Sequence, residues 1–125
     1  MRELFRRLQL SWGAKVFDYE EEAIEGVLEK SEKMIDLGVG DGNRAARLAK
    51  ICQANEVYGV DMDCTRLWHA QKKGIIGVRA DLNRPFPFRS GTFNLVNSNQ
   101  VIEHLIDPDT FAMEIRRILK VGVSP

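Results

Sequence analysis

Short apolar runs recur along the chain at a regular distance from one another. A run of this kind, without helical spacing, is typical of a buried strand. The last run lies inside a stretch from Ser90 to Ile102 that carries no charge, as expected for a strand covered on both faces. The sequence therefore predicts strands at Lys33–Leu37, Val57–Val60, Ile75–Ala80 and Phe93–Asn97.

Between and after these runs the apolar residues follow helical spacing. Phe111, Ile115 and Ile118 recur on one face of a segment that begins at Asp107-Pro108, an N-cap followed by proline at the first helical position. Asp63 is placed to cap a second helix. The sequence predicts helices from Asn43 to about Cys52, from Asp63 to about Lys73, and from Asp107 to Lys120.

An acidic stretch precedes the first predicted strand. Asp18 to Glu25 carries five acids and no base, and apolar residues at Ala23, Ile24, Val27 and Leu28 recur at helical spacing. We expect residues 1–32 to form an N-terminal helical segment, followed by a core over residues 33–120. Strands that alternate with helices predict one α/β domain over residues 1–125, built on a parallel sheet with flanking helices.

Composition narrows the class of protein. The 125 residues are 44% hydrophobic and 29% charged, and 18 basic side chains balance 18 acidic ones. The hydrophobic and charged fractions exclude a disordered chain. Because the net charge is zero, no overall electrostatic field attracts the chain to nucleic acid or anionic lipid. Two cysteines, Cys52 and Cys64, are typical of free thiols in a reducing setting. Met1 to Leu10 does not match a signal peptide, and we find no membrane span, so we expect a cytoplasmic location.

Polar and glycine residues stand directly after each predicted strand. Because parallel strands bring their carboxyl ends to one edge of the sheet, these positions are expected to meet where open α/β folds bind ligands. The intervals from one position to the next are each about one helix plus one strand. The positions are Gly38–Gly42, Asp61, Asp81 with Leu82, and Asn97 with Ser98.

The residue types at this edge suit a nucleoside. Gly38 and Gly40 allow a tight turn and a close approach of ligand to backbone, and the helix that follows presents free N–H groups. Asp61 is placed to accept hydrogen bonds from a ribose diol. Asp81 could accept from an exocyclic amine, with Leu82 beside the ring. Together these features predict a cofactor that contains adenosine.

The same residues resemble a known family. Met34-Ile-Asp-Leu-Gly-Val-Gly-Asp-Gly42 resembles the first motif of class I S-adenosylmethionine-dependent methyltransferases, and Tyr58-Gly-Val-Asp61 resembles their ribose-binding strand end. Ser98-Asn-Gln-Val-Ile-Glu-His-Leu105 and the later Glu114-Ile-Arg-Arg-Ile-Leu-Lys120 are similar to the methyltransferase type 11 subgroup. The resemblance covers about Lys33 to Lys120. It implies a Rossmann-like methyltransferase fold, S-adenosyl-L-methionine as cofactor and S-adenosyl-L-homocysteine as product.

The resemblance also implies roles for individual residues. Asp36 and the backbone of Gly38, Val39 and Gly40 would hold the methionine end of the cofactor. Asp61 would bind the ribose hydroxyls. The remaining implied contacts are Met62 and Leu82 beside the adenine, Asp81 at its amine, and the backbone of Asn97 and Ser98 on the methyl-donor side.

The chain departs from the family pattern at two places. Asn94 stands where the family usually has Asp. After Lys120 the family continues with Pro-Gly-Gly and three more strands, whereas this chain reads Val-Gly-Val-Ser-Pro125 and stops. The resemblance therefore implies a fold that lacks its last three strands and leaves the fourth strand as an open edge. Such an edge predicts pairing with a second copy of the chain.

The acceptor of the methyl group does not follow from the sequence. A small molecule is the first expectation from the resemblance. The bases between Arg66 and Arg89 keep RNA open as an acceptor, and a protein acceptor also stays open. His104 is the candidate general base, although a structural role for it and for Glu103 is the simpler interpretation. No standard metal spacing occurs.

Two other classes stay open at this stage. A non-catalytic cofactor-binding remnant, or a half that depends on a partner, would fit the absent strands. A nicotinamide-dependent dehydrogenase shares the glycine turn and the second-strand acid, but its motif Gly-x-Gly-x-x-Gly needs a third glycine at position 43, where this chain has Asn43.

Overall fold

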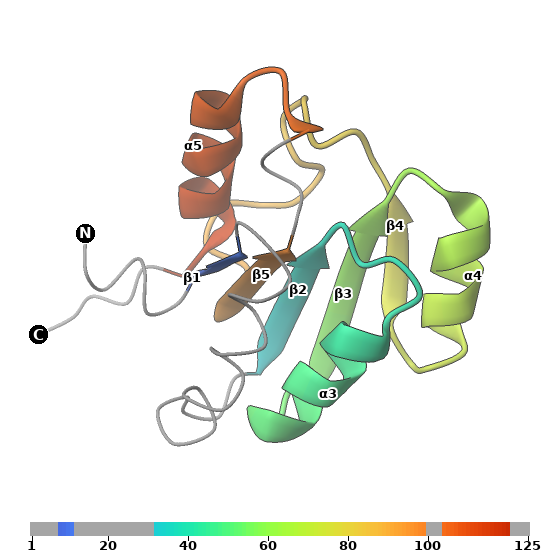
Figure 1. Ribbon diagram of the computed structural model, residues 1–125. Helices are drawn as coiled ribbons and strands as arrows, with labels where there is room; N and C mark the ends of the chain where they lie inside the picture. The colour runs from blue at the N-terminus through green and yellow to red at the C-terminus, as the bar shows by residue number, and fades with distance from the viewer. Residues whose placement is uncertain (1–7, 12–31, 100–103, 121–125) are drawn as a thin grey trace, which may run out of the picture.

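In the part of the chain that the structure describes, five parallel strands form one sheet. The computed structural model describes residues 8–11, 32–99 and 104–120 (Figure 1). The strands lie in the order β1-β5-β2-β3-β4, and every pair of neighbours is parallel. Their bounds are Leu8–Ser11 for β1, Lys33–Leu37 for β2, Glu56–Asp61 for β3, Ile76–Arg79 for β4 and Leu95–Asn99 for β5.

Helices cover both faces of this sheet. Helices α3 (Asn43–Ile51) and α4 (Cys64–Gln71) lie on one face, and α5 (Pro108–Ile118) lies on the other (Figure 1). Each face has its own buried cluster, because successive side chains of a strand point to opposite sides. In β2, Met34 packs with the α3 and α4 residues, whereas Ile35 packs with the α5 residues.

The four strands and three helices that the sequence predicts from residue 33 onward are confirmed, with shifts at their ends. The largest shift is in β5, which begins at Leu95 rather than Phe93. Phe93 instead forms an isolated parallel bridge with Leu119, and Asn94 exchanges two hydrogen bonds with the backbone of Lys33. Asn94 thus fastens the start of β5 to β2 through its side-chain oxygen.

The prediction that the fourth predicted strand, β5, has an open edge is wrong for the described residues. β1 pairs in parallel with β5, with Leu8 opposite Val96 and Ser11 opposite Asn99, so β5 lies between β1 and β2. These four N-terminal residues are a strand, not part of a helical segment. Pairing with a second copy through the free edge of β5 therefore loses its basis. The helix expected around Asp18–Glu25 lies outside the described residues.

Both predicted helix caps are present. The carboxylate of Asp63 accepts the backbone N–H groups of Thr65 and Arg66 at the start of α4. The carboxylate of Asp107 accepts the backbone N–H of Thr110 at the start of α5. Among the described residues, no helix has the length and apolar character that crossing a membrane requires.

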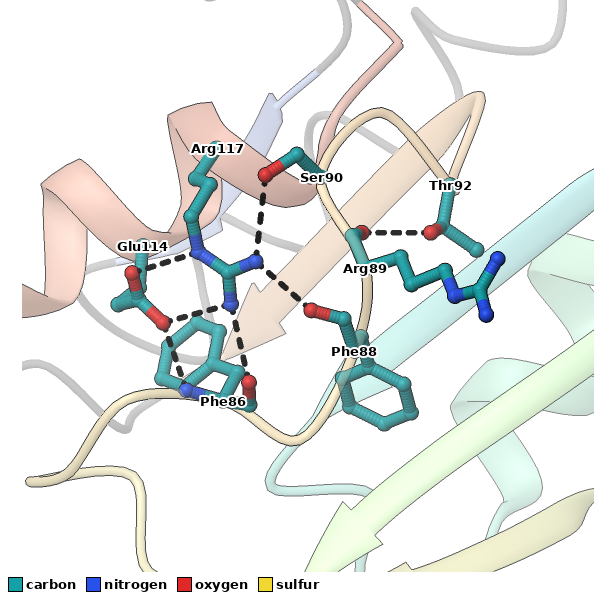
Figure 2. Close-up of polar contacts among 7 residues, drawn as sticks. All are labelled: Phe86, Phe88, Arg89, Ser90, Thr92, Glu114 and Arg117. Carbon is teal, nitrogen blue, oxygen red and sulfur yellow. Dashed lines mark hydrogen bonds and ion pairs between the residues drawn. The ribbon is translucent and has the colours of Figure 1, made fainter.

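A polar cluster fastens the loop before β5 to α5. The guanidinium of Arg117 donates to the backbone oxygens of Phe86 and Phe88 at 2.9 and 2.7 Å and pairs with Glu114 (Figure 2). Glu114 in turn accepts the backbone N–H of Phe86 at 2.7 Å. Arg117 thus satisfies loop carbonyls that have no strand partner, and this fixes the path between β4 and β5.

Candidate functional site

A cleft of about 610 Å³ opens at the carboxyl ends of β2 and β3. The strand ends and the turn between β2 and α3 contribute the residues predicted at this edge, namely Asp36, Gly38, Val39, Gly40 and Asp61. The rest of its lining consists of polar residues from the glycine turn, α3, α4 and the segment before α5, namely Asp41, Asn43, Arg44, Arg47, Arg66 and His104.

The glycine turn is held in place by β3. The backbone N–H groups of Gly38 and Val39 both donate to the carbonyl oxygen of Val60, at 2.8 and 2.9 Å. Gly38 and Gly40 have φ angles of 77° and 60°, in the left-handed region that favours glycine. A Cβ atom at Gly40 would meet nothing within 4 Å. Backbone conformation, and not crowding, therefore accounts for glycine at this position.

Asp61 ties the end of β3 to this turn. One carboxylate oxygen accepts the backbone N–H of Gly40 at 3.0 Å, and the other accepts the backbone N–H of Asp63 at 2.9 Å. A carboxylate oxygen can accept a second hydrogen bond. The two oxygens are therefore oriented by backbone and still able to accept two neighbouring hydroxyl groups.

Asp36 is a buried carboxyl group on the wall of the cleft. It is 3% exposed, and burial raises its pKa from 3.8 to about 7. The hydrogen bond from Asn97 and the charge of Arg44 act in the opposite direction, and the charge of Asp61 adds to the increase. At neutral pH this side chain is therefore close to its midpoint between the acid and the carboxylate.

Asn97 and Ser98 lie behind the cleft and not in its lining. Both are buried, and the Nδ2 group of Asn97 donates to Asp36 at 2.9 Å. The Oδ1 atom of Asn97 and the Oγ atom of Ser98 find no hydrogen-bond partner within the described part of the chain. Buried polar atoms without partners are uncommon and mark positions where a further group can be bound.

The residues expected beside the adenine lie outside the cleft lining. Met62 is 54% exposed just after Asp61, and its carbonyl oxygen accepts from Arg79. One oxygen of Asp81 accepts the backbone and side-chain N–H groups of Asn83 at 2.9 and 3.1 Å. Leu82 is partly buried against the α5-side cluster. The structure thus brings Asp36, the glycine turn and Asp61 together, and leaves Asp81 and Leu82 at a separate bend.

Sequence reasoning missed the arginines of the cleft. Arg44 and Arg47 stand three residues apart on α3, so they share one side of the helix directly after the glycine turn. That spacing was the available signal. His104, the candidate base, is exposed and lines the cleft. Within residues 8–11, 32–99 and 104–120, no group of three or more His, Cys, Asp or Glu residues is arranged to hold a metal ion.

The fold and the cleft define a Rossmann-like α/β domain with a ligand site at the carboxyl ends of its parallel strands. The model of a methyltransferase domain family, type 11, matches residues 35–124. The chain belongs to this methyltransferase family.

Two curated relatives show how far the likeness extends. An uncharacterized methyltransferase of Schizosaccharomyces pombe is 30% identical over 107 residues, which cover 76% of this chain and 38% of that protein. A malonyl-[acyl-carrier protein] O-methyltransferase of Legionella pneumophila is 27% identical over 125 residues, covering 96% of this chain and 42% of that protein. The chain thus spans about two fifths of the length of these relatives.

Solved structures agree on the fold. A phosphoethanolamine N-methyltransferase of Haemonchus contortus, in complex with phosphomonomethylethanolamine and S-adenosylhomocysteine, superposes with a TM-score of 0.68 at 27% identity, covering 82% of this chain and 26% of that one. A complex of a Haloferax volcanii methyltransferase with its activator Trm112 gives a TM-score of 0.68 at 21% identity, covering 86% and 54%.

Proposed function

We propose that this chain binds S-adenosyl-L-methionine and supports transfer of its methyl group to an acceptor. The observation that carries the proposal is the carboxylate of Asp61, oriented by the Gly40 N–H at the mouth of the glycine turn. A ribose diol requires two acceptor oxygens beside a backbone that a ligand can approach. Membership of the methyltransferase family supports the same cofactor.

Each predicted contact has a role in this proposal. Asp36 and the backbone of Gly38, Val39 and Gly40 hold the methionine end of the cofactor, and Asp61 holds the ribose. Met62 and Leu82 flank the adenine, and Asp81 faces its amine through the carboxylate oxygen that Asn83 leaves unused. The backbone of Asn97 and Ser98 lies toward the methyl donor.

The chemistry asks little of the protein beyond alignment. The sulfonium of the cofactor, when bound, supplies an electrophilic methyl group. The chain's own contribution is to hold the donor in a fixed position, so that an acceptor can approach in line with the carbon–sulfur bond. His104 is exposed on the cleft and could take a proton from an acceptor with a high pKa.

A small molecule is the acceptor that we propose first. The Haemonchus enzyme, at 27% identity, was solved with phosphomonomethylethanolamine, which is of this class. The Legionella relative is named for an acyl-carrier protein, so a protein-borne acceptor is the alternative, and RNA is a third. The free thiols Cys52 and Cys64 favour a reducing, cytoplasmic location.

A second candidate is a domain that binds the cofactor but turns over only with a partner. The chain spans about two fifths of its curated relatives, and one structural neighbour was solved together with a methyltransferase activator. This candidate predicts cofactor binding without methyl transfer by the purified chain.

Isothermal titration calorimetry of the purified chain with S-adenosylhomocysteine tests the proposal, with NAD as the matched control. We expect binding of S-adenosylhomocysteine and none of NAD. Binding of NAD alone would favour a dehydrogenase. A folded chain, judged by circular dichroism, that binds neither ligand would contradict the proposed cofactor site.

A further inference from the structure

The hydrogen bond between Asp36, on the wall of the cleft, and Asn97, behind it, has no role in the proposed function. Asp36 and Asn97 are opposite each other on the neighbouring strands β2 and β5. The Nδ2 atom of Asn97 lies 2.9 Å from an Asp36 carboxylate oxygen, and the two side chains are 0% and 3% exposed. A charge-assisted hydrogen bond between groups this deeply buried is strong, because little water competes for either partner.

The groups that surround Asp36 act on its pKa in opposite directions. Burial is the largest influence and favours the neutral acid, and the carboxylate of Asp61 on β3 adds to it. Arg44 on α3 and the amide of Asn97 on β5 favour the carboxylate. His104 lines the same cleft from the segment before α5. Because the resulting pKa is about 7, the loss of the hydrogen bond from Asn97 is enough to change how much of Asp36 is ionised at neutral pH.

The orientation of the Asn97 amide follows from this contact. If the amide were turned over, its Oδ1 atom would face a carboxylate oxygen, and two acceptors would repel. In the observed orientation, Oδ1 and the neighbouring Ser98 Oγ have no partner in the described residues. The amide therefore keeps its donor on Asp36 while its oxygen stays without a partner in the described residues.

We propose that Asn97 is a positioning residue, whose amide holds the Asp36 carboxylate ionised and oriented so that it binds the ammonium group of the cofactor. The inference deepens the proposed function and rests on it. An ammonium ion needs a charged acceptor, so binding at this point requires an ionised Asp36. The side chain of Asn97 touches no ligand and acts through Asp36.

The test is the pH dependence of S-adenosylhomocysteine binding, measured by calorimetry between about pH 5.5 and about pH 8.5. The ligand's carboxylate stays charged over this range, and the titration of its ammonium near the upper end is the same for every variant and cancels when the chains are compared. In the wild-type chain the affinity should rise through neutral pH and then level. Asn97→Val removes the amide and should move this rise upward by about one pH unit, so that the Kd near pH 7 weakens up to tenfold. At the highest pH the two chains should converge.

Asn94→Val is the matched control. Asn94 lies just before β5 and uses its amide oxygen on the backbone of Lys33, away from Asp36. The Asn94→Val variant should be less stable than the wild-type chain, but the pH midpoint of its binding profile should not move. An Asn97→Val midpoint that coincides with that of the wild-type chain would overturn the proposal.

A second variant and an NMR titration test the role of Asn97 if Asn97→Val or the binding measurement fails. If Asn97→Val does not fold, Asn97→Asp preserves the shape and should raise the midpoint further, because two adjacent carboxyl groups share one proton. Failure of the wild-type chain to bind S-adenosylhomocysteine at any pH would be a failure of the proposed function. In that case, a carbon-13 NMR titration of the Asp36 carboxyl group tests the effect of Asn97 on Asp36 without any ligand. A midpoint that rises in the variant supports it, and an unchanged midpoint overturns it.

Discussion

Asp61 combines a structural task with the binding task proposed for it. Its carboxylate accepts backbone N–H groups from the glycine turn and from the residue before α4. We expect Asp61→Ala to weaken S-adenosylhomocysteine binding by about 1.5 to 3 kcal/mol, the range for hydrogen bonds that involve a charged group. Asp61→Asn keeps one acceptor oxygen and should lose less. Calorimetric titration of the three chains provides the comparison.

Asp63→Ala serves as the control for this change. Asp63 caps α4 two residues away, so its loss should cost about 1 kcal/mol of stability and leave the dissociation constant unchanged. If Asp61→Ala bound the ligand as tightly as the wild-type chain, Asp61 would have no part in ribose binding.

Single residues of the cleft were predictable only where local geometry fixes them. Asp61 and the glycine turn could be placed from the sequence because each directly follows a strand. Asn97 could be placed at the edge in the same way, but its bond to Asp36 joins residues 61 positions apart. That contact depends on β5 lying beside β2 in one register, which periodicity along a single chain does not encode.

At the scale of elements, the Arg117 cluster decides how the loop before β5 packs on α5. Arg117→Met would leave the Phe86 and Phe88 carbonyls and the Glu114 carboxylate without their shared donor. We expect a loss of about 2 to 3 kcal/mol in the free energy of unfolding. The stability of Arg117→Lys should lie between that of the wild-type chain and that of Arg117→Met, because an ammonium group cannot reproduce the forked contact of a guanidinium.

Urea denaturation measures this loss, and Arg116→Met is the matched control. Arg116 is the exposed neighbour on the same helix, and its replacement should change stability by no more than about 0.5 kcal/mol. Equal stabilities of the two methionine variants would show that the cluster contributes nothing to the fold.

Two glycines that face each other on β3 and β4 give a second comparison between elements. A Cβ atom at Gly59 would lie 2.7 to 2.9 Å from the side chain of Val39, whereas at Gly77 the nearest atom is the flexible end of Gln71 at 3.0 Å. Gly59→Ala should therefore cost about 1 to 3 kcal/mol through overpacking against the glycine turn. Gly77→Ala should be close to neutral, and thermal unfolding of both variants compares them. A smaller loss at Gly59 than at Gly77 would contradict this packing argument.

Most elements were predictable because their apolar spacing agrees with their position in the fold. The helix over Pro108–Ile118 is the clearest case, with cap, proline and buried face all in register. β1 was missed because its four residues, Leu8 to Ser11, are too short to show alternation and lie close to arginines. Its structure comes from pairing with β5, and such tertiary pairing overrides local preference.

At the scale of the whole molecule, several carboxyl groups together set the pH at which the domain is most stable. Hydrogen bonds from Arg117 lower the pKa of Glu114, and hydrogen bonds from Thr110 lower that of Asp107. Their contributions are present above the unfolded-state pKa and are lost as the pH falls through the folded-state pKa. Asp36 has the opposite sign, because burial raises its pKa from 3.8 to about 7.

Asp36 should therefore make the ligand-free domain less stable as the pH rises. The folded state holds this proton more tightly than the unfolded state, so the contribution of Asp36 is fully present below pH 3.8 and is lost as the pH rises to about 7. At about 1.4 kcal/mol per pKa unit, the loss amounts to about 4 kcal/mol. Because the contributions of Glu114 and Asp107 are lost at still lower pH, we expect the domain to be most stable at mildly acidic pH.

Asp36→Asn isolates this contribution, because asparagine does not ionise and its side-chain oxygen can still accept from Asn97. Urea denaturation near pH 5 and near pH 8 should show the wild-type chain losing stability relative to Asp36→Asn as the pH rises. Parallel curves would show that Asp36 titrates normally. Since a buried carboxylate weakens the empty domain, its presence on the cleft wall is best explained by the cation that it is proposed to bind. Saturating S-adenosylhomocysteine should then stabilise the wild-type chain more than Asp36→Asn.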